Sequence, residues 1–232
     1  MAEIVQYRIE KTLDEIKLLV DFGILSKDEA REITNKRENF EYALRKRTKT
    51  KLDFLKYIRF EMNLLESIEQ YKTTILSKSK NMDEVDRKIF QLQSKKLNEI
   101  IRSRAAHISV LYRELTTKFQ FDKKLWKAYI DFAKQRKWNS RVSALYWRLL
   151  RVAGDDESLW MQAAAHEIET NEDKDTARKL YLLGLRHHPK SEKILSELAE
   201  ICDTKTLRQY KEDKMQPNVQ STSTESANFN EL

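Results

Sequence analysis

Glycine, proline and cysteine are scarce in this sequence of 232 residues, which contains three Gly, two Pro and one Cys. Hairpins and phosphate-binding loops need Gly or Pro at fixed positions, so this composition argues against sheets and Gly-rich nucleotide sites. The single Cys202 excludes an internal disulfide framework and indicates a reducing compartment. No apolar run is long enough to cross a bilayer, so we expect no membrane-spanning helix. The composition predicts an all-α protein of long helices joined by short polar turns.

The net charge of +7 is unevenly distributed along the chain. Residues 36–59 contain nine Lys and Arg against three Asp and Glu, and residues 134–151 contain six basic residues and no acid. Residues 155–173 then contain seven acids and no Lys or Arg. Such stretches are typical of solvated helix faces, and they also suit a nucleic acid or an acidic partner. Charge alone leaves both interpretations open.

Apolar spacing and capping residues predict the helices of the N-terminal half. A helix over 3–20 ends before Gly23, and the capping-box sequence Ser26–Glu29 opens a second helix that runs to about residue 47. A third is expected over about 50–77. Residues 83–118 fit one very long helix or two, since neither Gly nor Pro marks a break.

Shorter helices follow, with capping or helix-ending residues at regular intervals. Asp122 is expected to cap a helix to about residue 135, and Asn139 a helix to about 152 with Gly154 after its end. The next helix starts at Ser158 or an acid before it, and others start at Asp175 and at Ser191, the former ending before Pro189. The last helix has Leu195, Leu198 and Ile201 without a matching partner helix, which predicts an uncovered apolar face. The polar, Ser/Thr-rich residues 213–232 are predicted to be disordered.

Aromatic residues recur at an interval of 34. Trp126 and Trp160 are one such interval apart, and so are Tyr112 and Tyr146. Each tryptophan is also followed by a tyrosine at a similar spacing: Trp126 by Tyr146, and Trp160 by Tyr181. A helical hairpin leaves one apolar face that only the next hairpin can bury, so a repeat of this length predicts hairpins stacked as a solenoid from Tyr112 to about residue 201. Such a scaffold has extended surfaces and no natural catalytic pit.

The residue types identify the kind of repeat. The segment "WKAYIDF" spaces Trp126, Tyr129 and Phe132 three apart, without the Gly of the tetratricopeptide repeat. It resembles the first helix of the half-a-tetratricopeptide (HAT) repeat, "TARKLYLLGLRHHP" resembles the second, and "DFLKYIRFE" resembles a further first helix. HAT repeats are associated with protein scaffolds of RNA-processing assemblies. The predicted repeat core is Phe54, Tyr57, Phe60, Tyr112, Trp126, Tyr129, Phe132, Tyr146, Trp160, Tyr181 and Pro189.

The first hairpin is much longer than the others. Phe54 lies far further from Tyr112 than Trp126 lies from Tyr146, so an inserted segment extends this hairpin. This divides the chain into an N-terminal helical region (1–49), a first HAT-like hairpin with a long helical insertion (50–118), further HAT-like repeats (119–212) and the tail (213–232). The expected fold class is therefore an all-α, HAT/tetratricopeptide-like solenoid preceded by N-terminal helices.

Residues 1–65 carry a more specific resemblance. The segments "MAEIVQYRIEKTLDEIKLLVDFGILSKDEAREI" and "RENFEYALRKRTKTKLDFLKYIRFEMNLLE" resemble the U-three small nucleolar RNA-associated HAT-repeat proteins of the small-subunit processome. The resemblance implies a non-enzymatic nucleolar scaffold in small-subunit ribosomal RNA processing, within the subcomplex known as UTP-B. It implies protein subunits of a preribosomal complex as partners, with U-three small nucleolar ribonucleoprotein or pre-rRNA contacted directly or through them. Members of this family continue through many further repeats, whereas this chain reaches its polar tail after about three.

No arrangement of residues indicates catalysis. "HEIET" at His166 begins like a zinc-protease helix but has Thr170 where the second ligand belongs, and "RHHP" places His187 and His188 at a helix end. Cys202 has no base at catalytic spacing. We expect no catalytic residue, no cofactor, no metal and no small-molecule substrate.

One helix carries a candidate partner surface. On the helix from Asn139, Trp147 lies off the apolar stripe and beside the basic face of Arg141, Arg148 and Arg151. Together with Lys134, Arg136 and Lys137, these cations form a basic ridge in the sequence. An exposed Trp beside Arg is typical of a protein-binding anchor, and the alternative is that Trp147 packs against the neighbouring repeat. Two other functions stay open: direct RNA binding through residues 36–59 and 134–151, and a generic tetratricopeptide-type adaptor.

Overall fold

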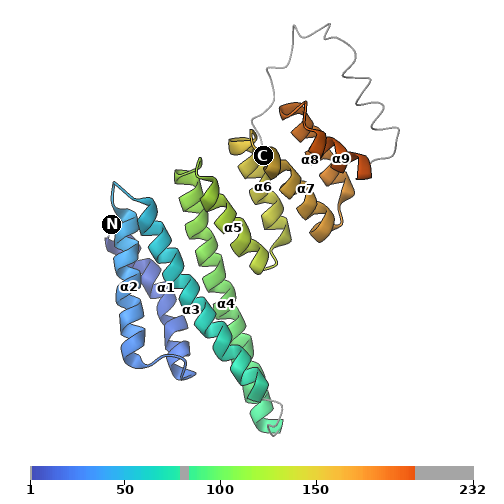
Figure 1. The fold of residues 1–232 in the computed structure, drawn as a ribbon. Helices are drawn as coiled ribbons and strands as arrows, with labels where there is room; N and C mark the ends of the chain where they lie inside the picture. Colours follow the sequence, from blue (N-terminus) through green and yellow to red (C-terminus); the bar gives the residue numbers. More distant parts are fainter. Residues whose placement is uncertain (1, 79–83, 202–232) are drawn as a thin grey trace, which may run out of the picture. The chain divides into compact units, whose positions relative to one another are not determined.

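The computed structural model describes residues 2–78 and 84–201, and every regular element in these ranges is an α-helix. The expected all-α fold is therefore confirmed for the described part of the chain. The helices, shown in Figure 1, are α1 (Ala2–Asp21), α2 (Lys27–Arg45), α3 (Lys51–Lys78), α4 (Glu84–Lys118), α5 (Lys123–Gln135), α6 (Asn139–Ala153), α7 (Glu157–Asn171), α8 (Lys174–His187) and α9 (Glu192–Ile201).

The capping residues explain where several helices begin. Ser26 and Glu29 form the predicted capping box of α2, and Asp122 caps α5 by accepting a hydrogen bond from the backbone N–H of Lys124. Gly23 has a φ of +70° just after α1, a left-handed conformation that Gly adopts without steric cost. Residues 84–118 form one helix, which settles the alternative left open by the sequence.

Two predicted helix starts are wrong in detail. The cap of α8 is Asp173, whose carboxylate accepts from the backbone N–H and the hydroxyl of Thr176, whereas Asp175 lies inside the first turn. Asn139 is the first residue of α6 rather than its cap. For α7 the sequence left Ser158 or an acid before it as the start. Asp156 is the cap, and its carboxylate accepts a hydrogen bond from the backbone N–H of Ser158.

The chain divides into two compact units, and the boundary falls within α6 between Leu145 and Tyr146. In the N-terminal unit, the long helices α3 and α4 lie side by side, with α1 and α2 on one side of them and α5 beside α4 (Figure 1). An apolar cluster joins three of these helices through the buried side chains Leu19, Leu64, Ile68, Leu97 and Ile100.

Charged side chains are buried in the same unit. Arg37 of α2 donates two hydrogen bonds to the carboxylate of Glu61 on α3, at 2.7 and 2.9 Å, and the two side chains are 2% and 0% exposed. Burial opposes the charge on Arg37, but the neighbouring Glu61 carboxylate raises the pKa of the guanidinium above its ordinary value. Around this pair, Arg104 forms an ion pair with Glu15 at 2.8 Å. Arg104 also lies 4.0 Å from Glu61, so these contacts link α2 and α4 to α3 and α1 to α4.

The C-terminal unit contains the end of α6 with α7, α8 and α9. Gly184 of α8 lies close to Trp160 of α7, since a Cβ atom placed on Gly184 would be 3.1 Å from the Trp160 side chain. On α9, Leu198 is buried and Leu195 and Ile201 are partly buried, so the predicted apolar face is largely covered within the described residues. Cys202 and the predicted disordered tail, 213–232, lie outside the described residues.

Candidate functional site

The predicted repeat-core residues are buried in both units, with two exceptions. Phe60 is partly exposed and Pro189 is exposed. The buried members in the N-terminal unit are Phe54, Tyr57, Tyr112, Trp126, Tyr129 and Phe132, and those in the C-terminal unit are Tyr146, Trp160 and Tyr181. The periodic aromatic residues are therefore core residues, and the functional surface has to be sought elsewhere.

Hydrogen bonds repeat at the same interval as the aromatic residues of the sequence. The indole N–H of Trp126 donates to the backbone oxygen of Gln120 at 2.8 Å, and that of Trp160 donates to the backbone oxygen of Gly154 at 2.9 Å. In both cases the acceptor lies six positions before the tryptophan. Asp122 and Asp156 cap the two helices through bonds of 3.1 Å to the backbone N–H two positions on. The two segments thus have the same local structure.

Ring contacts explain one departure from the repeat pattern. Tyr112 and Phe132 lie 5.7 Å apart between ring centroids, and the positions one repeat later, Tyr146 and His166, lie 5.9 Å apart. His166 therefore occupies the place of a core aromatic and is 4% exposed. His166 therefore packs in the core as the aromatic residue of the preceding segment does.

The other histidines also take part in packing. Burial lowers the pKa of His107 to about 4, and its Nε2 lies 3.1 Å from the hydroxyl of Tyr57. The ring of His187 stacks on Trp160 at 5.2 Å, and the ring of His188 bonds to the backbone oxygen of Gly154 at 3.0 Å. Within residues 2–78 and 84–201, no three His, Cys, Asp or Glu side chains are grouped to hold a metal ion. None of the helices in those ranges is long and apolar enough to cross a membrane.

Trp147 is the exposed aromatic of α6. Its side chain is 36% exposed in the C-terminal unit, whereas Tyr146 and Leu149 of the apolar stripe are buried. Arg151 is exposed and Arg148 is partly buried on the same stretch of helix. The predicted anchor and Arg151 therefore lie at the surface, and Arg148 is half-buried.

Two cations of the predicted basic ridge have contacts within the N-terminal unit. Arg136 binds the carboxylate of Glu69 with both terminal nitrogens, so its charge is paired. Arg141 donates to the hydroxyl of Ser109 at 2.7 Å, and its guanidinium lies 4.5 Å from the ring centroid of Trp138. Both arginines hold the turn between α5 and α6 against α3 and α4. Arg136 is therefore a poorer candidate for partner binding than the exposed Arg151.

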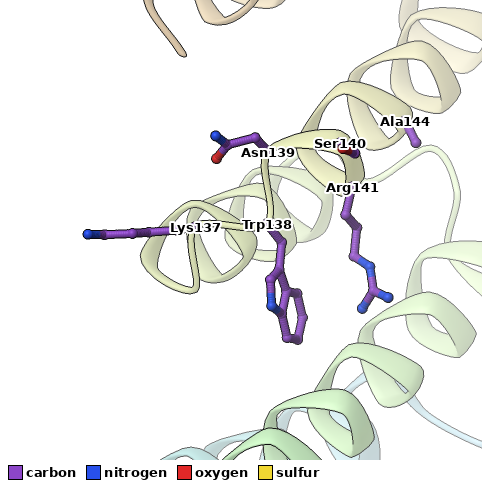
Figure 2. A pocket seen from close by; sticks show the side chains of 6 residues that line it. All are labelled: Lys137, Trp138, Asn139, Ser140, Arg141 and Ala144. Atoms are coloured by element: carbon purple, nitrogen blue, oxygen red, sulfur yellow. The ribbon is translucent and has the colours of Figure 1, made fainter. Parts of the chain in front are cut away.

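A hollow that the sequence did not predict lies at this turn. Figure 2 shows Trp138 and Arg141 pointing in the same direction from the start of α6, while Lys137 points away from them. The open volume is about 630 Å³, and it is lined by Lys137, Trp138, Asn139, Ser140, Arg141 and Ala144. Lys137 has a φ of +56°, an uncommon conformation for a residue other than Gly, which ends α5 sharply. The motif "RKWN" gave no signal of this geometry, because Gly is the usual marker of such a turn.

Comparison with known proteins places this chain near one group of relatives. The profile of the family described as U3 small nucleolar RNA-associated protein 6 matches residues 9–93. The chain is 32% identical over 215 residues to the U3 small nucleolar RNA-associated protein 6 homolog of Homo sapiens and 30% identical over 215 residues to that of Mus musculus. It is 30% identical over 186 residues to the U3 small nucleolar RNA-associated protein 6 of Schizosaccharomyces pombe.

The matched segments cover most of this chain but a minor part of each relative. The matches to the Homo sapiens and Mus musculus proteins each include 92% of this chain and 33% of the relative. The match to the Schizosaccharomyces pombe protein includes 80% of this chain and 35% of the relative. The chain thus spans about a third of the length of the curated relatives it matches. The similarity extends through both compact units.

Proposed function

We propose that this chain is part of a non-enzymatic, HAT-repeat scaffold in a nucleolar preribosomal particle associated with U3 small nucleolar RNA. The observation that carries the proposal is the similarity over 92% of the chain to proteins named for association with that RNA. The particle is the small-subunit processome, and the subcomplex is UTP-B. Its partners are other protein subunits of the particle.

The repeated local structure supports the HAT assignment. The caps Asp122 and Asp156, and the indole bonds of Trp126 and Trp160, recur one repeat apart. Repeats of this kind stack to give extended surfaces that contact several partners. Burial of the periodic aromatic side chains supports a scaffold role, because it leaves the outer helix faces for binding.

The surface around Trp147 is the proposed contact for a protein partner. A large aromatic that is 36% exposed beside Arg151 has the composition of a binding hot spot. If a protein docks there, Trp147→Ala weakens binding at least as much as the double change Arg148→Ala/Arg151→Ala, and high salt has a small effect. A loss that occurs only with the arginine variant, and only at low salt, indicates a nucleic-acid backbone instead.

The processing role is tested by depleting the protein in cells of its own organism. We expect the precursor of the small-subunit ribosomal RNA to accumulate and the large-subunit RNA to be little changed, with RNA blots as the measurement. An essential protein of an unrelated process, depleted in parallel, controls for slowed growth. An unchanged ratio of precursor to mature small-subunit RNA contradicts the proposal.

A further inference from the structure

Two basic segments that are distant in the sequence meet at one end of the N-terminal unit. Residues 44–53 include the end of α2, its connection to α3 and the start of α3, and residues 118–124 include the end of α4, its connection to α5 and the start of α5. Lys51 forms an ion pair with Asp122, and the Nζ of Lys118 donates to the backbone oxygen of Lys49 at 2.8 Å. We call these two segments the basic end. Figure 1 shows both connections at the same end of the helices.

The basic end has a strong excess of positive charge. Its segments contain Arg45, Lys46, Arg47, Lys49, Lys51, Lys118, Lys123 and Lys124, against only Asp53 and Asp122. Both carboxylates are occupied: Asp53 accepts from the backbone N–H and the hydroxyl of Thr50, and Asp122 binds Lys51 and caps α5. Hydrogen bonds from Thr50 lower the pKa of Asp53, and the hydrogen bond from Lys51 lowers the pKa of Asp122. Both acids therefore stay ionised while they hold these hydrogen bonds. The local field therefore attracts an anion.

Exposed apolar side chains accompany these cations. Phe121 is 78% exposed, the highest value among the large apolar residues that the structure describes, and Leu52 is 58% exposed. Each lies next in sequence to a member of the Lys51–Asp122 ion pair, so the ion pair holds the two at the same end. A ligand that covers an exposed aromatic ring gains free energy by removing its apolar surface from water.

We propose that the basic end binds single-stranded nucleic acid, with phosphates beside the lysines and arginines and one base stacked on Phe121. A flexible phosphate backbone carries a charge at each nucleotide, so it can follow cations on two separate segments. Every base has a π-face that stacks on an aromatic ring regardless of sequence. An acidic peptide matches the charges but supplies no planar group for Phe121 at a fixed spacing. This inference does not depend on the scaffold assignment, because it concerns this unit alone.

The test measures binding of fluorescein-labelled oligouridine by fluorescence anisotropy over a range of salt concentrations. The charge variant is Lys46→Gln/Arg47→Gln/Lys124→Gln, whose side chains are exposed. The matched control is Lys95→Gln/Lys96→Gln/Arg102→Gln on α4, which removes three exposed positive charges elsewhere in the same unit. We expect the charge variant to make the slope of log affinity against log salt less negative by about 2, at roughly 0.7 per phosphate, and the control to retain the slope.

The variant Phe121→Ala tests the aromatic contact separately. Its control is Leu92→Ala, because the Leu92 side chain is 60% exposed in the native chain. Phe121→Ala is expected to weaken binding about 5- to 150-fold with the salt slope unchanged, as loss of one stacked base does. The proposal is overturned if the two triple variants lose affinity equally, if Phe121→Ala binds as tightly as the native chain, or if polyglutamate displaces the oligonucleotide as effectively as unlabelled oligouridine. Failure here leaves the scaffold proposal standing, and the depletion experiment decides that one independently.

Discussion

The indole N–H of Trp126 donates to the backbone oxygen of Gln120, 2.8 Å away, and so connects α5 to the turn that precedes it. Because the bond is made by a side chain that is 2% exposed, the ring fills the core while its polar atom is satisfied. The indole N–H of Trp160 makes the corresponding bond, to the backbone oxygen of Gly154, 34 positions further along the chain. In both segments the tryptophan therefore fills the core and also bonds to the turn that precedes its helix.

The variant Trp126→Ala is expected to lower the free energy of unfolding by roughly 3–5 kcal/mol, because it leaves a large cavity in the core. Trp126→Phe keeps most of the volume but leaves the Gln120 oxygen without this donor, and we expect a loss of about 1 kcal/mol or more. Urea denaturation followed by circular dichroism measures both. Trp147→Ala is the control, since its exposed ring predicts a small change. Equal effects at Trp126 and Trp147 contradict the assignment of Trp126 to the core.

The Arg37–Glu61 pair provides a second test. Glu61→Gln leaves the buried Arg37 charge without its carboxylate, and we expect a loss of about 3–5 kcal/mol in the free energy of unfolding. The exposed pair of Lys36 with Glu32 is the matched control, and Glu32→Gln should change stability by about 0.5 kcal/mol or less.

The double variant Arg37→Met/Glu61→Leu separates the charge effect from the packing effect. Replacing both partners with apolar side chains removes the uncompensated charge, so this variant is expected to be more stable than Glu61→Gln. If the double variant is as unstable as Glu61→Gln, loss of shape rather than loss of charge balance explains the result.

His107 predicts a pH dependence of stability. Its pKa is about 4 in the folded chain because of burial, against the ordinary value of 6.5. Between these values the unfolded chain binds a proton that the folded chain does not, so stability falls as the pH is lowered below 6.5. The expected loss from this group is about 2 kcal/mol between pH 7.5 and pH 5.

The variant His107→Gln retains a polar group next to the Tyr57 hydroxyl and cannot take up this proton. Urea denaturation at both pH values should show a smaller loss for the variant than for the native chain. The difference between the two chains isolates His107 from the carboxylates that titrate in the same range. Parallel losses in both chains mean that the imidazole is not buried neutral.

The sequence predicted the helices well because their signals are local. Ser26, Asp122 and Gly23 act on the backbone within a few residues, so capping rules place them correctly. Asp175 misled because Asp173 satisfies the same pattern two positions earlier, and only the hydrogen bonds to Thr176 distinguish them. The aromatic period likewise predicted burial at Trp126 and Trp160.

Surface properties were predicted less well, because they depend on contacts between distant segments. Arg136 and Arg141 belong to one run of basic residues in sequence, yet Glu69 and Ser109 engage them from other helices. Phe121 gave no signal, since an aromatic in a turn is buried or exposed according to what packs on it. The basic end depends on an ion pair between residues 71 positions apart, which no local pattern reveals.

Recovery of U3 small nucleolar RNA with the tagged chain from cells of its own organism tests the central claim most directly. Quantitative reverse transcription compares U3 RNA with an unrelated small nucleolar RNA in the same eluate, and the Trp126→Ala chain serves as a control for folding. We expect enrichment of U3 RNA over the unrelated RNA with the native chain and loss of that enrichment with the variant. Equal recovery of both RNAs with the native chain contradicts it.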